Sequence, residues 1–186
     1  MANESIVTPE FRACFISVFK ATSMMNANGT ASEPKFSVRA AFPPKADLSG
    51  LKELAKKAAL DKFGDKIPKA MRSPFRLNEE LDNPVASIGD DWTIITFSAN
   101  ADRRPGLVDA NLQDIISEED VYSGAWFRAQ IRAYGYDKAG NKGVAFGLQN
   151  LQKLRDDDPI GGGRTPANKA FEAVSSGAKT ASNLFD

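Results

Sequence analysis

The 186-residue chain has no histidine and a single cysteine, Cys14. Hydrolytic centres that use an imidazole as the general base are therefore excluded, and so are zinc sites built from histidine and cysteine. A single thiol also excludes an internal disulfide bond. No motif requires a cofactor, so we expect none. Only carboxylate chemistry with a cation such as magnesium stays open.

Long apolar runs and an excess of charge of one sign are also missing. No apolar segment approaches the roughly 20 residues that span a bilayer. Residues 1–10 lack the charged start and the apolar stretch of a secretion signal, so we expect a cytosolic protein. The 24 basic and 24 acidic side chains cancel. Any nucleic-acid site must therefore come from local segregation of charge.

Secondary structure is predicted from residue type and from the period of the apolar pattern. Aromatic and β-branched residues, or alternating apolar and polar ones, predict five strands. The strands are residues 11–20, 35–42, 92–97, 125–136 and 143–148, the last two joined by a hairpin turn at 137–141. Residues 47–63 have helical spacing and predict one helix ending near Gly64. We expect a mainly β fold with one helix, a small five-stranded barrel with long loops.

Two segments have little predicted structure. Residues 65–90 carry three prolines and several basic side chains, which indicates a long basic loop. Beyond Arg155 the composition changes to Asp, Gly, Ser, Ala and Thr, with few large apolar residues. Such a segment buries too little apolar surface to order itself. We therefore predict a domain over residues 1–155 and a flexible C-terminal tail over residues 156–186.

Strand 125–136 is the most informative segment for function. Alternation assigns Phe127, Ala129, Ile131 and Ala133 to a core face. The opposite face interleaves flat rings and guanidinium groups; its members are Trp126, Arg128, Gln130, Arg132 and Tyr134. Rings stack on unpaired bases while cations follow the phosphates. This pattern indicates non-specific binding of single-stranded DNA, although polar strand faces also carry arginine without binding nucleic acid.

Other side chains extend the candidate site. Lys35 and Arg39 form a second basic strand face, opposite the apolar side chains of residues 36–42. Phe75 and Arg76 lie in the basic loop, and Trp92 begins a strand. For Phe75 and Trp92 a position in the core is the preferred alternative.

Acidic clusters at 79–82, 90–91 and 118–120 offer a competing function. Carboxylates could hold the metal ion of a nuclease or another replication enzyme. Each cluster is local and lies in a predicted turn, where solvated charge is the usual explanation. The glycine-rich stretch 161–164 lacks the lysine and hydroxyl ending of a phosphate-binding loop.

Four stretches resemble the single-stranded DNA-binding proteins of tailed bacteriophages: residues 104–109, 122–124, 141–153 and 161–164, with a looser match at 74–76. The resemblance implies an OB-fold barrel that coats DNA during phage replication and recombination, in the cytoplasm of the infected host and without catalysis. It adds Tyr122 and Lys142 to the DNA-binding candidates. It also implies phage replication proteins as partners of the tail. The usual OB order places the helix between the third and fourth strands, whereas here it is expected after the second.

Overall fold

The computed structural model describes residues 4–161 and 170–174. The elements are β1 (Ser5–Val7), β2 (Phe11–Thr22), β3 (Lys35–Phe42), α1 (Ser49–Phe63), β4 (Arg76–Leu77), η1 (Asn78–Glu80), β5 (Thr93–Asn100), β6 (Gly106–Val108), η2 (Glu118–Asp120), β7 (Trp126–Lys138) and β8 (Asn141–Arg155). The fold is mainly β with one α-helix in this part of the chain, as the sequence predicted. Most of the predicted tail, with Arg164 and the aromatic chain end at Phe185, lies outside the described residues.

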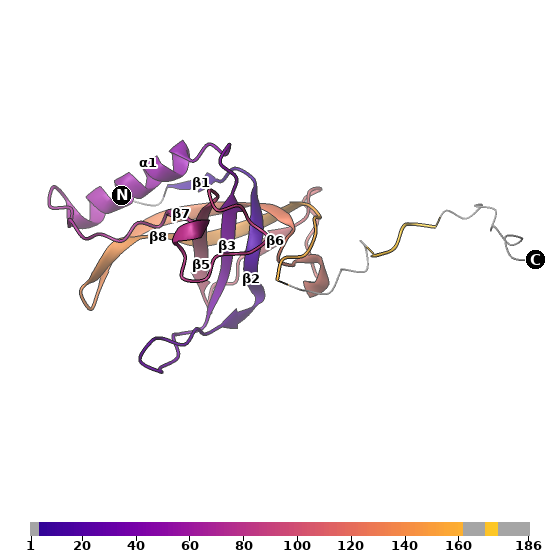
Figure 1. Ribbon diagram of the computed structural model, residues 1–186, viewed down its shortest axis with the longest axis horizontal. Helices are drawn as coiled ribbons and strands as arrows, with labels where there is room; N and C mark the ends of the chain where they lie inside the picture. The colour runs from indigo at the N-terminus through magenta and orange to yellow at the C-terminus, as the bar shows by residue number, and fades with distance from the viewer. Residues whose placement is uncertain (1–3, 162–169, 175–186) are drawn as a thin grey trace, which may run out of the picture.

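Five strands pair into a closed ring in the order β2-β3-β5-β8-β7 (Figure 1). The pairing of β5 with β8 is parallel and the others are antiparallel. β7 returns to β2 where Phe11 faces Phe127 and Arg12 faces Trp126. These are the five strands predicted from sequence. The short strands β1, β4 and β6, which the sequence did not reveal, add to β7, β5 and β8.

The interior of the ring holds one fully buried phenylalanine from each of its five strands: Phe11, Phe42, Phe97, Phe127 and Phe146. Neighbouring rings lie 5.5 to 6.4 Å apart between centroids, mostly tilted or edge-on. This geometry suits the quadrupole of aromatic rings. The alternation along β7 is confirmed as well, because each of the four side chains assigned to its core face is at most 4% exposed.

The helix α1 packs against β7 and β8, along the long hairpin that these strands form (Figure 1). Its buried side chains are Leu51, Leu54, Ala55, Ala58 and Ala59, which are among the apolar positions that predicted it. Gly135 of β7 allows the close approach, since a Cβ there would lie 2.4 Å from Lys62 Cβ. The chain leaves α1 at Gly64, whose N–H donates to Leu60 O at 2.8 Å. As expected from sequence, α1 follows the second strand of the ring.

The expectation of a loop over residues 65–90 is partly wrong. Asn78 is fully buried; its side-chain amide donates to Val85 O and Ile88 O, both at 3.0 Å, and accepts from Val85 N–H at 2.8 Å. Sequence patterns miss such a turn because one buried amide, rather than a periodic backbone ladder, holds it together. A second core cluster consists of Cys14, Ala41, Val85, Ile88, Ile94 and Ile160. It covers one end of the outer face of β2, β3 and β5.

Residues just beyond β8 also contact the ring. Ile160 is 7% exposed within the second core cluster, and Ile160 N–H donates to Ser123 O at 2.9 Å. β8 itself runs to Arg155, well past the predicted end at 148, through two irregularities in its pairing with β7. The segment 156–161 therefore packs on the fold. The division into a domain and a tail at residue 155 remains a prediction.

Candidate nucleic-acid interface

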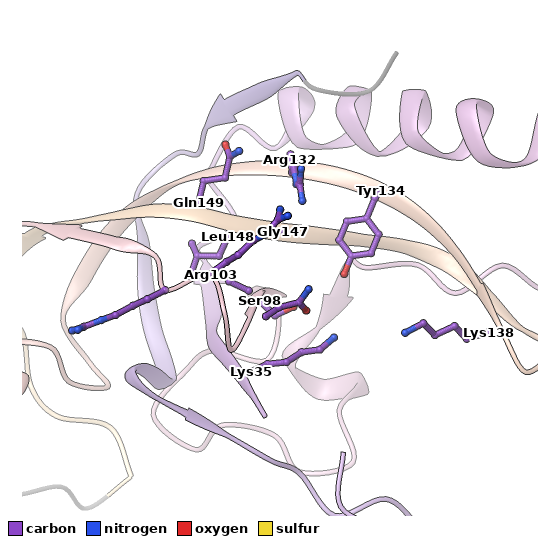
Figure 2. Close-up of a pocket in the computed structure, with 12 residues that line it drawn as sticks. Lys35, Ser98, Arg103, Arg132, Tyr134, Lys138, Gly147, Leu148 and Gln149 are labelled. Atoms are coloured by element: carbon purple, nitrogen blue, oxygen red, sulfur yellow. The ribbon is translucent and has the colours of Figure 1, made fainter. Parts of the chain in front are cut away.

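A cavity of about 420 Å³ opens on the outer face of the ring and is lined by five cationic side chains (Figure 2). They are Lys35 from β3, Arg103 and Arg104 from the β5–β6 connection, and Arg132 and Lys138 from β7. Its other lining residues are neutral. In the part of the chain that the structure describes, none of the five cations forms an ion pair with a carboxylate. The neutral net charge thus conceals a positive site, which attracts anions such as phosphate.

The floor of this cavity, at Ser98 and Gly147, and the surface that continues from it to Ser37 follow from the strand register. Ser37 of β3 faces Ser98 of β5, Ser98 faces Gly147 of β8, and Gly147 faces Arg132 of β7. Phe97 and Phe146, the neighbours of Ser98 and Gly147, point into the core, so the row of small residues lies outside. Small side chains leave the backbone of three strands open to a ligand. The larger cationic groups stand at the margins.

Tyr134 supplies an accessible ring beside these cations. It is 39% exposed. Partial burial raises the pKa of its hydroxyl, and Tyr136 adds to this, while Arg132 and a hydrogen bond with Ser98 act in the opposite direction. The hydroxyl is therefore neutral at physiological pH and adds no negative charge. Figure 2 shows the Tyr134 ring beside the space into which Lys35 and Lys138 extend. The arrangement combines an aromatic surface with cations, as single-stranded nucleic acid requires.

A second cavity of about 760 Å³ adjoins the first and shares Lys35 and Ser98 with it. Side chains of β2, β3 and β5 line it, among them Phe15, Ser37 and Arg39. The guanidinium carbon of Arg39 lies 5.2 Å from the centroid of the Phe15 ring. We call the two adjoining cavities the outer groove. It crosses the ring from β2 to β7.

Four of the residues predicted from sequence come together in the outer groove: Lys35, Arg39, Arg132 and Tyr134. Two strand faces that were identified separately thus belong to one surface, because β5 and β8 lie between β3 and β7 in the ring. Gln130 lies further along the same face of β7, where its side chain accepts from Asn150 at 2.7 Å.

Trp126 lies elsewhere. It lies eight positions before Tyr134 in β7, which is roughly 26 Å along a strand. Its Nε1–H donates to Asp157 Oδ2 at 2.8 Å, and the guanidinium carbon of Arg155 lies 4.4 Å from its ring centroid. The Trp92 ring centroid is 6.1 Å away. Both tryptophans therefore already have protein neighbours, outside the outer groove.

Two further candidates are also engaged at the end of β8. The Tyr122 hydroxyl donates to Asp156 Oδ1 at 2.7 Å, and burial, together with this carboxylate, raises its pKa. Arg128 is exposed, and its Nε–H donates to Gln152 Oε1 at 2.6 Å. Neither side chain lines the outer groove.

The last three candidates lie on the α1 side of the fold or at the hairpin. Phe75 packs edge-on against the buried Phe146 at 5.8 Å, which agrees with the alternative of a core position. Arg76 is exposed and donates to Glu80 O at 2.7 Å. Lys142 lies 3.7 Å from Asp137 across the β7–β8 hairpin.

Sequence reasoning missed four of the cationic and aromatic residues that line the outer groove: Phe15, Arg103, Arg104 and Lys138. The two adjacent arginines directly before Pro105 are a signal that could have been used, since a basic turn often contacts phosphate. The sequence pattern identifies Phe15 only as a strand residue. Nothing in its sequence neighbourhood marks it as exposed.

The acidic clusters do not converge. Within residues 4–161 and 170–174, no three acidic or cysteine side chains are grouped closely enough to hold a metal ion. In the same residues, no helix combines the length and apolar character needed to cross a membrane.

Comparison with known proteins identifies the family. The family model described as Enterobacter phage Enc34, ssDNA-binding protein, matches residues 4–182. The chain therefore belongs to this family of phage proteins, and the resemblance stated from sequence is confirmed. A protein of Acyrthosiphon pisum secondary endosymbiont phage 1, named putative protein p50, is 34% identical over 80 residues. That match covers 42% of this chain and 43% of the relative, less than half of its length.

Solved structures share the fold at low sequence identity. The single-stranded DNA-binding protein from bacteriophage Enc34 superposes with a TM-score of 0.65 at 20% identity, over 90% of each chain. The same protein in complex with ssDNA gives 0.66 at 18% identity, over 84% of this chain and 89% of that one. The single-stranded DNA-binding protein gp2.5 of bacteriophage T7 gives 0.59 at 15% identity, over 85% of this chain and 95% of that one.

Proposed function

We propose that this protein binds single-stranded DNA in the outer groove and coats it, without sequence preference, during phage DNA replication and recombination in the cytoplasm of the infected cell. The observation that carries the proposal is the cavity that five cations and Tyr134 line together, with no carboxylate among its lining residues. Membership of a phage single-stranded DNA-binding family supports it.

The chemistry of the groove favours single strands over duplex. Cations at the margins neutralise phosphates, and each neutralised phosphate releases counterion. Tyr134 offers a flat face to an unpaired base, which a base inside a duplex cannot use. Stacking and phosphate contacts do not depend on base edges, so little sequence preference is expected. Binding of this kind requires no reaction, and we propose that the protein is not an enzyme.

The ring supports an OB-type barrel as the scaffold. A ring of five strands in the order β2-β3-β5-β8-β7, with β5 and β8 parallel, supports a small five-stranded barrel of this class. The position of α1, after the second strand of the ring rather than the third, departs from the usual order.

The partner proteins belong to the same proposal. We expect phage replication proteins to contact the C-terminal tail, on the basis of the family resemblance. The proposed tail is residues 156–186, and its first residues up to Ile160 pack on the fold through the second core cluster.

A titration at low salt tests the function. Labelled single-stranded and double-stranded DNA of equal length are mixed with protein, with and without magnesium, and followed by gel shift. We expect a shift of intact single strands at lower protein concentration than of duplex. Cleaved DNA in the magnesium lanes would instead favour a nuclease. Absence of any single-strand shift would refute the proposed function.

The outer groove itself is tested by paired variants. Arg132→Gln and Lys35→Gln remove one cation each from the groove. Lys52→Gln removes an exposed cation from α1, away from the groove, and serves as the matched control. We expect weaker binding for the first two and unchanged binding for the third. Equal losses in all three variants would mean that the groove is not the binding site.

A further inference from the structure

Phe15 has a backbone conformation that strands rarely contain. Its φ is +48°, in the left-handed region that favours glycine. The pairing of β2 with β3 explains the positive φ of Phe15. Cys14 faces Arg39 and Ser17 faces Ser37, so β2 uses one residue more than β3 over this step. Phe15 thus lies in a β-bulge, at a position where glycine is the usual residue.

The side chain gains no burial in return for this conformation. Phe15 is 58% exposed, whereas Ala13 and Cys14 before it are fully buried. Single exposed apolar residues are common and require no explanation. A strained backbone that displays an aromatic ring to solvent is different, because both features cost stability and folding alone accounts for neither.

The displayed ring faces the β2 side of the outer groove. Around it lie the hydroxyl-bearing residues Ser17, Ser37 and Thr96, and Arg39 is over the ring. Attraction between a guanidinium and an aromatic face holds both groups in place. The adjoining cavity, with its five cations, begins at the shared Lys35. The groove therefore has a half lined by cations and a half in which the exposed Phe15 ring lies among neutral side chains, Arg39 and Glu33.

We propose that Phe15 is a platform on which one unpaired nucleobase stacks, and that the bulge in β2 is retained because it presents this ring. The inference rests on the proposed function, since it assigns a base-binding subsite within the same groove. Arg39 positions the Phe15 ring and supplies a cation to the nucleotide stacked there. The strand of DNA then runs from this subsite past Lys35 to the cations around Tyr134.

Phe15→Gly separates stacking from folding, because glycine adopts a positive φ without strain. We expect the variant to melt at the same temperature as the parent or higher. Its affinity for single-stranded DNA should fall about ten- to hundredfold, the range for loss of one stacked base. Phe15→Tyr keeps the ring and should bind like the parent. A marked fall in Tm for Phe15→Gly, or unchanged affinity, would overturn the proposal.

An abasic oligonucleotide of the same length provides the second measurement. It retains the phosphates and lacks the bases, so parent and Phe15→Gly should bind it equally. A persistent difference would mean that Phe15 acts on the backbone contacts instead, and would overturn the stacking role. Failure of the parent to bind any single-stranded DNA would refute the proposed function. Parent binding with a silent Phe15→Gly variant would refute this inference alone.

Discussion

Arg132 of β7 lies across the backbone of Gly147 in β8. A Cβ at position 147 would stand 3.3 Å from Arg132 Cγ and 3.4 Å from Arg132 Nε. The two residues face each other in the register of the strand pair. Because Gly147 has no side chain, the Arg132 side chain can lie close to the β8 backbone at the floor of the outer groove.

Gly147→Val should displace Arg132 while the strand stays intact, because Gly147 is not among the described residues with positive φ. We expect DNA affinity to fall about tenfold, comparable to loss of one charge-assisted contact. Fluorescence anisotropy with labelled single-stranded DNA measures this. In the Arg132→Gln background the valine should have little further effect. Additive losses would contradict the coupling of the two residues.

Binding should weaken steeply as salt concentration rises. Each neutralised phosphate contributes a slope of about −0.7 in the logarithmic plot of affinity against salt for single strands. We expect Arg104→Gln and Arg132→Gln each to flatten the slope by about that amount, and Lys52→Gln to leave it unchanged. A flat salt dependence of the parent protein would exclude the electrostatic part of the model.

The two faces of β7 should respond differently to alanine. Phe127 is fully buried, so Phe127→Ala should cost about 3–5 kcal/mol of unfolding free energy through the cavity it leaves. Tyr134→Ala should lose about 1–3 kcal/mol of binding and cost less stability than Phe127→Ala, because Tyr134 is 39% exposed. Thermal melts and DNA titrations of both variants check this. Loss of binding by Phe127→Ala at parental stability would contradict the assignment of the faces.

Two truncations test the contacts of residues 156–161. A chain ending at Gly161 keeps the buried Ile160 and the hydrogen bond from Trp126 to Asp157. Its Tm should therefore match that of the parent protein. A chain ending at Arg155 loses both and should be less stable by about 2–4 kcal/mol, from one buried isoleucine and one hydrogen bond. Calorimetry distinguishes the two. Equal melting temperatures would show that this segment adds nothing to the fold.

Cys14 should be inert in the folded protein. Burial raises the pKa of its thiol to about 11, and the opposing effect of Arg12 and Arg39 is smaller. Little thiolate exists at pH 8, so a thiol reagent should react only after unfolding. The pKa of this thiol is higher in the folded protein than in the unfolded chain. Its contribution to the free energy of unfolding is therefore fully present below the ordinary pKa near 9.0, and it is lost as pH rises through about 11. Fast labelling of native protein at pH 8 would contradict this.

The sequence by itself determined which face of β7 is buried and where α1 lies. Alternation has a period of two, so the assignment of Phe127 and Ile131 to the core required only the residue types at alternate positions of the strand. The apolar spacing over residues 47–63 similarly located the helix. Lys35, Arg39, Arg132 and Tyr134 were found because each stands opposite a core residue on its own strand.

Only the tertiary structure decided how these residues meet. The parallel pairing of Ser98 with Gly147 joins strands separated by the whole β6–β7 region, and closure of the ring around five phenylalanines fixes that register. It brings the Arg103 and Arg104 turn to the same cavity as Arg132. Trp126 is the opposite case. The sequence pattern predicts that its side chain faces outward, but in the structure it contacts Asp157 and Trp92. The local sequence pattern determines to which face of a strand each side chain points. Which residues of other strands lie beside it depends on long-range packing.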